Sequence, residues 1–145
     1  MIFIPNAETH EKWNLIGGAI AGTYLFLQTP PMFTTPQIVV MLLSLLLGTF
    51  YFNPDLDTGS RARKRWWLFG FIWKPFNHRG ILHSPLLYIG LFVISLGVAK
   101  FVTMAPYAVY AVYAPYLMGG IVVSAFIHIL ADKVMDIMHI AEKII

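Results

Sequence analysis

Residues 13–54 read WNLIGGAIAGTYLFLQTPPMFTTPQIVVMLLSLLLGTFYFNP and contain no Lys, Arg, Asp or Glu. A buried helix in a soluble protein can explain one charge-free run, but not several in a chain of 145 residues. Charged residues make up 12% of the whole chain, about half of the roughly one quarter that soluble domains carry. The sequence therefore predicts an all-α membrane protein that crosses the bilayer several times.

Four apolar segments are the predicted transmembrane helices: 13–28, 37–52, 81–104 and 107–131. Pro30, Pro54 and Pro106 separate them, because proline lacks a backbone donor and clashes with the preceding helical turn. Gly18 and Gly22 in the first segment have the small-xxx-small spacing that lets membrane helices approach closely. We expect one membrane-embedded helical domain over residues 1–145.

Two further features of composition limit the kind of protein. The chain has no cysteine, which excludes disulfides and thiolate metal ligands. Its first residues, MIFIPNAETHEK, lack a basic region followed by an apolar core and a small-residue cleavage site, so we predict no signal peptide.

The loop between the second and third segments is polar, basic and rich in tryptophan. It runs from Asn53 to Ser84 and holds six of the ten Lys and Arg residues: Arg61, Arg63, Lys64, Arg65, Lys74 and Arg79. The positive-inside rule places such a loop in the cytoplasm. With two predicted helices on each side of it, both termini are then also cytoplasmic, and the protein is expected in an inner (plasma) membrane.

The same loop interleaves its cations with Trp66, Trp67 and Trp73. Mixed aromatic and basic segments can bind nucleic acid by stacking. Beside membrane helices the simpler interpretation is an interfacial segment that contacts anionic phospholipid headgroups. Membrane lipid is therefore the expected partner, and a nucleic-acid partner is not expected.

The predicted topology brings most of the histidines and aspartates to one membrane face, at the ends of all four helices. Those residues are His10, Asp55, Asp57, His78, His83, His128 and Asp132. His128 and Asp132 are four residues apart, so they share a helix face and can bind one ion together. Taken together, the seven residues predict a metal site at the cytoplasmic face.

Each of these residues also has a simpler interpretation when it is considered alone. His10 could lie on the surface near a helix start, and Asp55 and Asp57 could be turn formers after Asn-Pro. His83 or His128 could be a packed, hydrogen-bonded histidine. Asp136 and His139, further along the chain, could face water or lipid headgroups, and we did not assign them to the site.

Four short motifs carry a resemblance to a known family: THEKW at 9–13, NPDLD at 53–57, HRGILHS at 78–84 and HILAD at 128–132. In this order they resemble the YdjM-like family of membrane-bound metal-dependent hydrolases. That family is distantly similar to zinc-dependent phospholipase C and P1-type nucleases, which bind metals through scattered His and Asp on helices. Where the family often has Thr-His-Ser, this chain has Leu82-His83-Ser84, so any role of that Thr hydroxyl is absent here.

A site built from imidazole and carboxylate groups suits Zn²⁺ first, with Mn²⁺ or Fe²⁺ as alternatives. Seven candidates exceed one tetrahedral shell, so one or two ions are expected, with the remaining residues in supporting positions. Asp55 or Asp57 could bridge two ions or accept a proton from the attacking water. Arg79 could stabilise phosphoryl charge, since its planar fork matches phosphate.

These expectations lead to two main hypotheses for the function. In the first, the protein is a membrane-bound metal-dependent hydrolase of phosphoesters, such as a phospholipid or a lipid-linked phosphate, at the cytoplasmic leaflet. In the second, the metal only holds the helices together, and the protein acts by binding a lipid or protein partner. A third, a small membrane-permeabilising or ion-conducting protein, would need polar groups along the spans, and the first three segments offer few.

Overall fold

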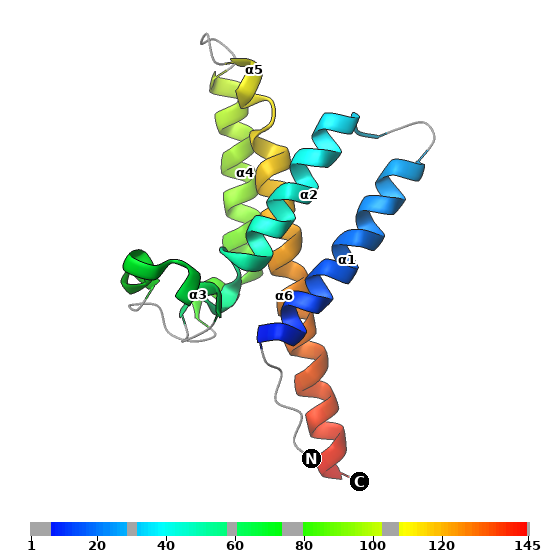
Figure 1. Ribbon diagram of the computed structural model, residues 1–145, viewed down its shortest axis with the longest axis vertical. Coiled ribbons are helices and arrows are strands. Elements are labelled where there is room, and N and C mark those ends of the chain that lie inside the picture. Colours follow the sequence, from blue (N-terminus) through cyan, green and yellow to red (C-terminus); the bar gives the residue numbers. More distant parts are fainter. Residues whose placement is uncertain (1–6, 29–31, 58–60, 74–79, 103–107, 145) are drawn as a thin grey trace.

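The computed structural model describes residues 7–28, 32–57, 61–73, 80–102 and 108–144 (Figure 1). The four long helices are α1 (Ala7–Leu27), α2 (Thr35–Phe50), α4 (Pro85–Val102) and α6 (Ala114–Ile144). The short α-helices are α3 (Arg61–Arg65) and α5 (Ala108–Ala111), and the 3₁₀ helices are η1 (Pro54–Asp57), η2 (Trp67–Trp73) and η3 (Ile81–His83). The described part of the chain contains no strand, so the predicted all-α class is confirmed for it.

Helix α6 is the element against which the other long helices pack. It lies between α2 and α4, and α1 leans against both α2 and α6 (Figure 1). A Cβ added at Gly120 of α6 would overlap the backbone of α2 at Met41 and Leu45, and one at Gly48 of α2 would lie 3.1 Å from the Cα atom of Ile121. Glycine at these two positions therefore allows α2 and α6 to approach backbone to backbone.

Small residues also set the contact between α1 and α2. A Cβ at Gly18 would lie 2.8 Å from Leu45 Cδ2, and a Cβ at Gly22 would lie 2.9 Å from Leu42 Cδ2. The small-xxx-small spacing of the first segment thus serves helix packing.

Three helical segments are long and apolar enough to cross a membrane: Thr35–Leu56, Pro85–Val102 and Ala114–Met138. They correspond to the second, third and fourth predicted spans. Helix α1 does not meet these criteria, because four ionisable residues fall within its first six positions. The structure therefore supports membrane association and three of the four predicted spans, and the first predicted span, 13–28, stays a prediction.

Several helix bounds differ from the predicted segments. Helix α1 begins at Ala7 rather than at Trp13, because the polar residues before Trp13 continue the helix although they are not apolar. Helix α4 begins only at Pro85, where proline suits a first helical position, and the three residues before Ser84 form η3. Helix α6 continues unbroken to Ile144, about 46 Å in all, which exceeds the ~30 Å of a hydrocarbon core.

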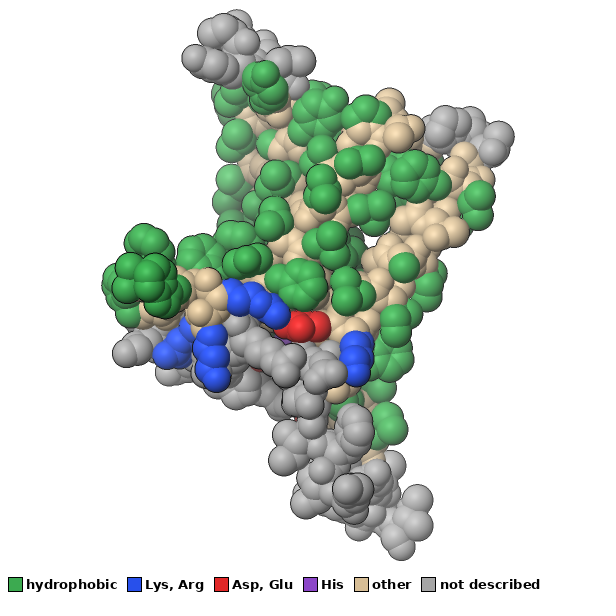
Figure 2. All heavy atoms as spheres, viewed as in Figure 1, with side chains coloured by type: hydrophobic (Ala, Val, Ile, Leu, Met, Phe, Trp, Pro, Cys, Tyr) green, Lys and Arg blue, Asp and Glu red, His purple; other side chains and the backbone are tan. Residues whose placement is uncertain are grey.

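The surface of the described helices is largely hydrophobic. Large apolar side chains are exposed on α2, α4 and α6, and they cover most of the upper body of the molecule in Figure 2. Soluble monomers rarely expose an apolar surface of this extent. Lys and Arg side chains are instead gathered in one band across the lower half of the same view (Figure 2). This separation of apolar surface from charge is what a membrane boundary requires.

Candidate metal centre

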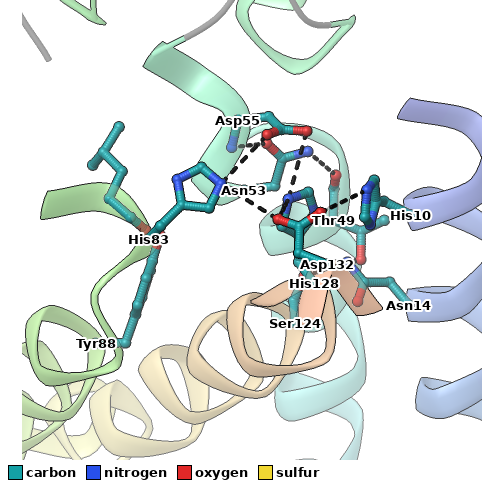
Figure 3. Close-up of polar contacts among 11 residues, drawn as sticks. His10, Asn14, Thr49, Asn53, Asp55, His83, Tyr88, Ser124, His128 and Asp132 are labelled. Carbon is teal, nitrogen blue, oxygen red and sulfur yellow. Dashed lines mark hydrogen bonds and ion pairs between the residues drawn. The ribbon is translucent and has the colours of Figure 1, made fainter. Parts of the chain in front are cut away.

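Five of the seven predicted ligands converge at one end of the helix bundle. His10 comes from the second turn of α1, Asp55 from η1, and His83 from the end of η3, while His128 and Asp132 lie one turn apart on α6 (Figure 3). Segments separated by more than a hundred residues thus contribute to a single cluster.

The nitrogen and oxygen atoms of the cluster face one another at similar separations. His83 Nε2 lies 3.5 Å from Asp55 Oδ1 and 3.6 Å from Asp132 Oδ2. His128 Nε2 lies 3.5 Å from Asp55 Oδ2 and 3.7 Å from Asp132 Oδ2. His10 Nε2 is 3.2 Å from Asp132 Oδ1. Four of the five separations are too long for good hydrogen bonds.

These separations match those between ligands that share one ion. Metal–ligand bonds of about 2.0–2.2 Å in a tetrahedral shell place two ligand atoms ~3.3 Å apart. Two groups of three side chains each have their ligand atoms within 4.8 Å of one another: His10, Asp55 and His128, and His83, His128 and Asp132. The two groups share His128, so together they form one cluster of three imidazoles and two carboxylates.

The burial of the imidazoles gives an independent indication of a ligand. His128 is 0% exposed and His10 is 4% exposed. Among the described residues, both ring nitrogens of His128 and Nδ1 of His10 have no hydrogen-bond partner. Buried polar atoms are nearly always paired, and an unpaired one is costly. A metal ion would satisfy His128 Nε2, which faces the two carboxylates, so the donor set and its geometry fit a divalent metal.

The residues before Asp55 direct its carboxylate into the cluster. Asn53 Nδ2 donates to the Thr49 carbonyl at 3.3 Å, which satisfies a carbonyl at the end of α2. The backbone N–H of Asp55 donates to Asn53 Oδ1 at 3.0 Å, forming an Asx turn across Pro54. The turn chemistry that could have been the role of Asp55 is therefore carried by Asn53, and the Asp55 carboxylate faces His83 and His128.

His83 is positioned by its apolar neighbour Leu82. The Leu82 side chain is buried and packs against Leu56, which joins η3 to η1. The Tyr88 hydroxyl donates to the Leu82 carbonyl at 2.8 Å and ties η3 to the first turn of α4. Leu82 stands where the resembling family often has Thr, and here it contributes packing.

A buried polar layer lies one turn below the cluster. Asn14 Nδ2 donates to Ser124 Oγ at 3.1 Å, and the hydroxyls of Ser124 and Thr49 are 3.2 Å apart (Figure 3). Asn14 is four residues after His10, and Ser124 is four residues before His128. These hydrogen bonds therefore tie α1, α2 and α6 together directly beneath the ligands. Sequence reasoning missed them, although polar residues four positions from a candidate ligand in an apolar helix were a usable signal.

Arg65 forms a second link that was missed. Its guanidinium pairs with Glu11 at 2.8 Å, donates to the Phe50 carbonyl at 3.0 Å, and lies 4.9 Å from the centre of the Phe50 ring. Glu11 is adjacent to His10 in the sequence. One side chain of the basic loop thus connects the end of α2 to the ligand-bearing turn of α1.

The side chains of three predicted site residues lie outside the described part of the structure. His78 and Arg79 lie outside the described residues, and so does the side chain of Asp57, whose backbone ends η1. Asp136, which we left out of the site, is exposed on α6 one turn beyond Asp132.

Comparison with known proteins assigns the chain to a family. A protein of Aquifex aeolicus (strain VF5), described as an uncharacterized protein, is 49% identical in an alignment of 47 positions that covers 29% of this chain and 33% of that relative. The chain therefore matches about a third of the relative's length. No solved structure matches the chain. Residues 5–116 match the model of the uncharacterized metal-binding protein family (DUF2227), and the chain belongs to this family of metal-binding proteins.

Proposed function

We propose that this metal-binding protein is a membrane-bound metal-dependent hydrolase of phosphoesters, related to the YdjM-like family. The observation that carries the proposal is the convergence of three imidazoles and two carboxylates, at 3.2–3.7 Å, from α1, η1, η3 and α6. Sites of this composition are used to activate water and to bind phosphoryl oxygens.

The ligand chemistry favours Zn²⁺, with Mn²⁺ or Fe²⁺ as alternatives. Three imidazoles disfavour Mg²⁺ and Ca²⁺, which prefer oxygen ligands, and the absence of cysteine leaves no thiolate for softer metals. Asp55 and Asp132 each present their two oxygens to different histidines. Either carboxylate could therefore bind one ion or lie between two, so we propose that the site holds one or two ions.

The roles of the protein groups follow from their positions. A divalent ion bound here would supply positive charge for phosphoryl oxygens and would lower the pKa of a water. Asp55 and Asp132 would bind the ion beside the imidazoles, because their carboxylates face the same Nε2 atoms. Asp57, two residues after Asp55, is proposed as the proton acceptor, and Arg79, four residues before His83, as the group that binds phosphoryl charge.

The proposed substrate is a phospholipid or a lipid-linked phosphate. The cluster lies where α2 ends and α4 begins, at the level of Arg65, whose guanidinium pairs with Glu11 beside His10. A phosphate at a membrane surface would occupy that level. By the positive-inside rule, we propose that this surface is the cytoplasmic leaflet of an inner membrane.

Hydrolysis by the purified protein tests this proposal. The protein in lipid nanodiscs, loaded with Zn²⁺ or Mn²⁺, would be assayed on p-nitrophenyl phosphodiesters, phosphatidic acid and phosphatidylglycerol. His83→Ala should lose turnover at least a hundredfold, whereas Asp136→Asn, which removes an exposed carboxylate on the same helix as Asp132, should retain it. Full activity in His83→Ala would disprove the assigned site.

A second function is compatible with the same geometry. The ligands come from four separate segments, so an ion could serve only to hold them together while the protein binds a lipid or protein partner. In that case chelation would lower the unfolding temperature, and no phosphoester would be turned over. Loss of turnover on chelation with an unchanged unfolding temperature would instead favour the hydrolase.

A further inference from the structure

The segment 61–73, made of α3 and η2 and called here the arm, exposes an unusual number of large apolar side chains. Trp67 is 83% exposed, and Leu68, Phe69, Phe71 and Ile72 are also exposed. Because residues on several sides of η2 are exposed, no apolar core lies behind it within the described residues. An apolar patch of this kind marks an interaction surface.

The arm is held firmly in place despite its exposure. Trp66 Nε1 donates to the Tyr51 carbonyl at 2.7 Å, and the Trp66 ring packs edge-on against Phe52 at 5.3 Å. A Cβ at Gly70 would lie 3.1 Å from the Arg63 carbonyl oxygen, so α3 and η2 are folded closely on each other. The arm is thus fixed to the end of α2, where that helix would leave the bilayer.

Charge and apolar surface are separated on the arm. In Figure 2 a group of apolar side chains projects at the left edge, and Lys and Arg side chains lie to its right and below it. Lys64 on α3 is among the exposed cations. An arrangement of apolar side chains on one side and cations on the other is typical of segments in the plane of a membrane interface.

A groove separates the arm from α2. It has a volume of about 340 Å³ and is lined by Leu47, Tyr51, Phe52, Arg65, Trp66 and Phe69. All of these residues except Arg65 are apolar or aromatic, so the groove suits a hydrocarbon chain. Arg65 is the one charged residue that lines it.

We propose that the arm is a docking surface for anionic phospholipid, with η2 inserted among the acyl chains and the exposed Lys64 of α3 on the headgroup phosphates. The occupant follows from charge complementarity and from the position of the arm at the end of an apolar helix. This proposal rests on the membrane location in the proposed function and is independent of the metal and of hydrolysis. A second copy of the chain or another protein would be a different occupant.

Site-directed spin labels can test the proposal, because the chain has no cysteine of its own. Leu68→Cys and Phe71→Cys would carry the label on η2. Lys64→Cys is the control on the cationic side, and Ile94→Cys on α4, also exposed, is the reference within the bilayer. Each full-length variant would be placed in nanodiscs of phosphatidylcholine, with or without phosphatidylglycerol, and probed with oxygen and with water-soluble chromium oxalate.

Labels on η2 should show an oxygen-to-chromium-oxalate accessibility ratio close to that at position 94 and several-fold above that at position 64. The ratio should rise when phosphatidylglycerol is included, and Lys64→Glu should reduce this rise. Greater access to chromium oxalate than to oxygen in both lipids would overturn the proposal. An equal ratio in both lipids would overturn the headgroup assignment. Spin–spin broadening that disappears on dilution with unlabelled protein would identify a second copy as the occupant instead.

Discussion

The close approach of α2 and α6 makes a sharp prediction about Gly120. A Cβ there would overlap the backbone of α2 at Met41 and Leu45, whereas a Cβ at Gly97 on α4 would meet nothing within 4 Å. Gly120→Ala and Gly97→Ala therefore make the same chemical change in two helices, with and without a steric clash.

Two opposing effects determine how much each substitution changes the free energy of unfolding. Replacing Gly by Ala inside a helix favours the helix by up to about 1 kcal/mol, and Gly97→Ala should gain that amount. At Gly120 the added methyl meets backbone atoms, which cannot rotate away. Overpacking typically costs about 1–3 kcal/mol, and contact with backbone places this variant at or above the upper end. Because the propensity gain is the same in both variants and cancels, we expect Gly120→Ala to be less stable than Gly97→Ala by about 3 kcal/mol or more.

The consequence should reach the metal centre, because α2 leads into Asp55 and α6 carries His128. Separating these helices would lengthen the distance between the two side chains, and Zn²⁺ affinity should fall with stability. Reversible unfolding in mixed micelles, monitored by circular dichroism, gives the stability, and competition with a chromophoric chelator gives the affinity. Equal stability and affinity in the two alanine variants would refute the packing that we describe.

Three further predictions concern groups near the cluster. Ser124→Ala removes two buried hydrogen bonds beneath the ligands. It should lower the free energy of unfolding by about 1–3 kcal/mol and the metal affinity about 10–100-fold. Ser95→Ala is the control: the Ser95 hydroxyl donates to a carbonyl of its own helix, so neither quantity should change. Arg65→Gln leaves the Glu11 carboxylate without its ion pair, so the free energy of unfolding, measured with heat or denaturant, should fall by about 1–3 kcal/mol. Adding Glu11→Gln to the same chain should recover part of this loss. Asn53→Ala removes the Asx turn and should weaken metal binding about tenfold in the chelator competition, with an unchanged affinity contradicting its role in orienting Asp55.

The sequence predicted the helical class and the convergence of His and Asp for a physical reason. Charge is disfavoured inside apolar spans, so ionisable residues are expected near the ends of the spans, and the chain topology decides at which face. On α6 this holds only in part, because the helix continues for twelve residues beyond Asp132. This reasoning grouped His10 with Asp132, which lie 122 positions apart and whose side chains are 3.2 Å apart in the structure. It required only the order of apolar segments and the positive-inside rule.

The helix bounds were less predictable, because hydropathy marks where a helix is apolar and not where it begins. Helix α1 therefore starts before Trp13, and His10 lies within it rather than ahead of it. The Arg65–Glu11 pair could not have been predicted, since it depends on how the arm folds back on α2. The layer formed by Asn14, Thr49 and Ser124 also needed the relative rotation of three helices.

Metal content of the purified protein is the most direct test of the central claim. The protein would be solubilised without chelators and measured by elemental mass spectrometry beside His83→Ala, His128→Ala and Asp136→Asn. We predict stoichiometric Zn or Mn in the wild type and in Asp136→Asn, and a large loss in both histidine variants. Absence of metal from the wild type, or metal retained in both histidine variants, would contradict the assignment of the cluster as a metal centre.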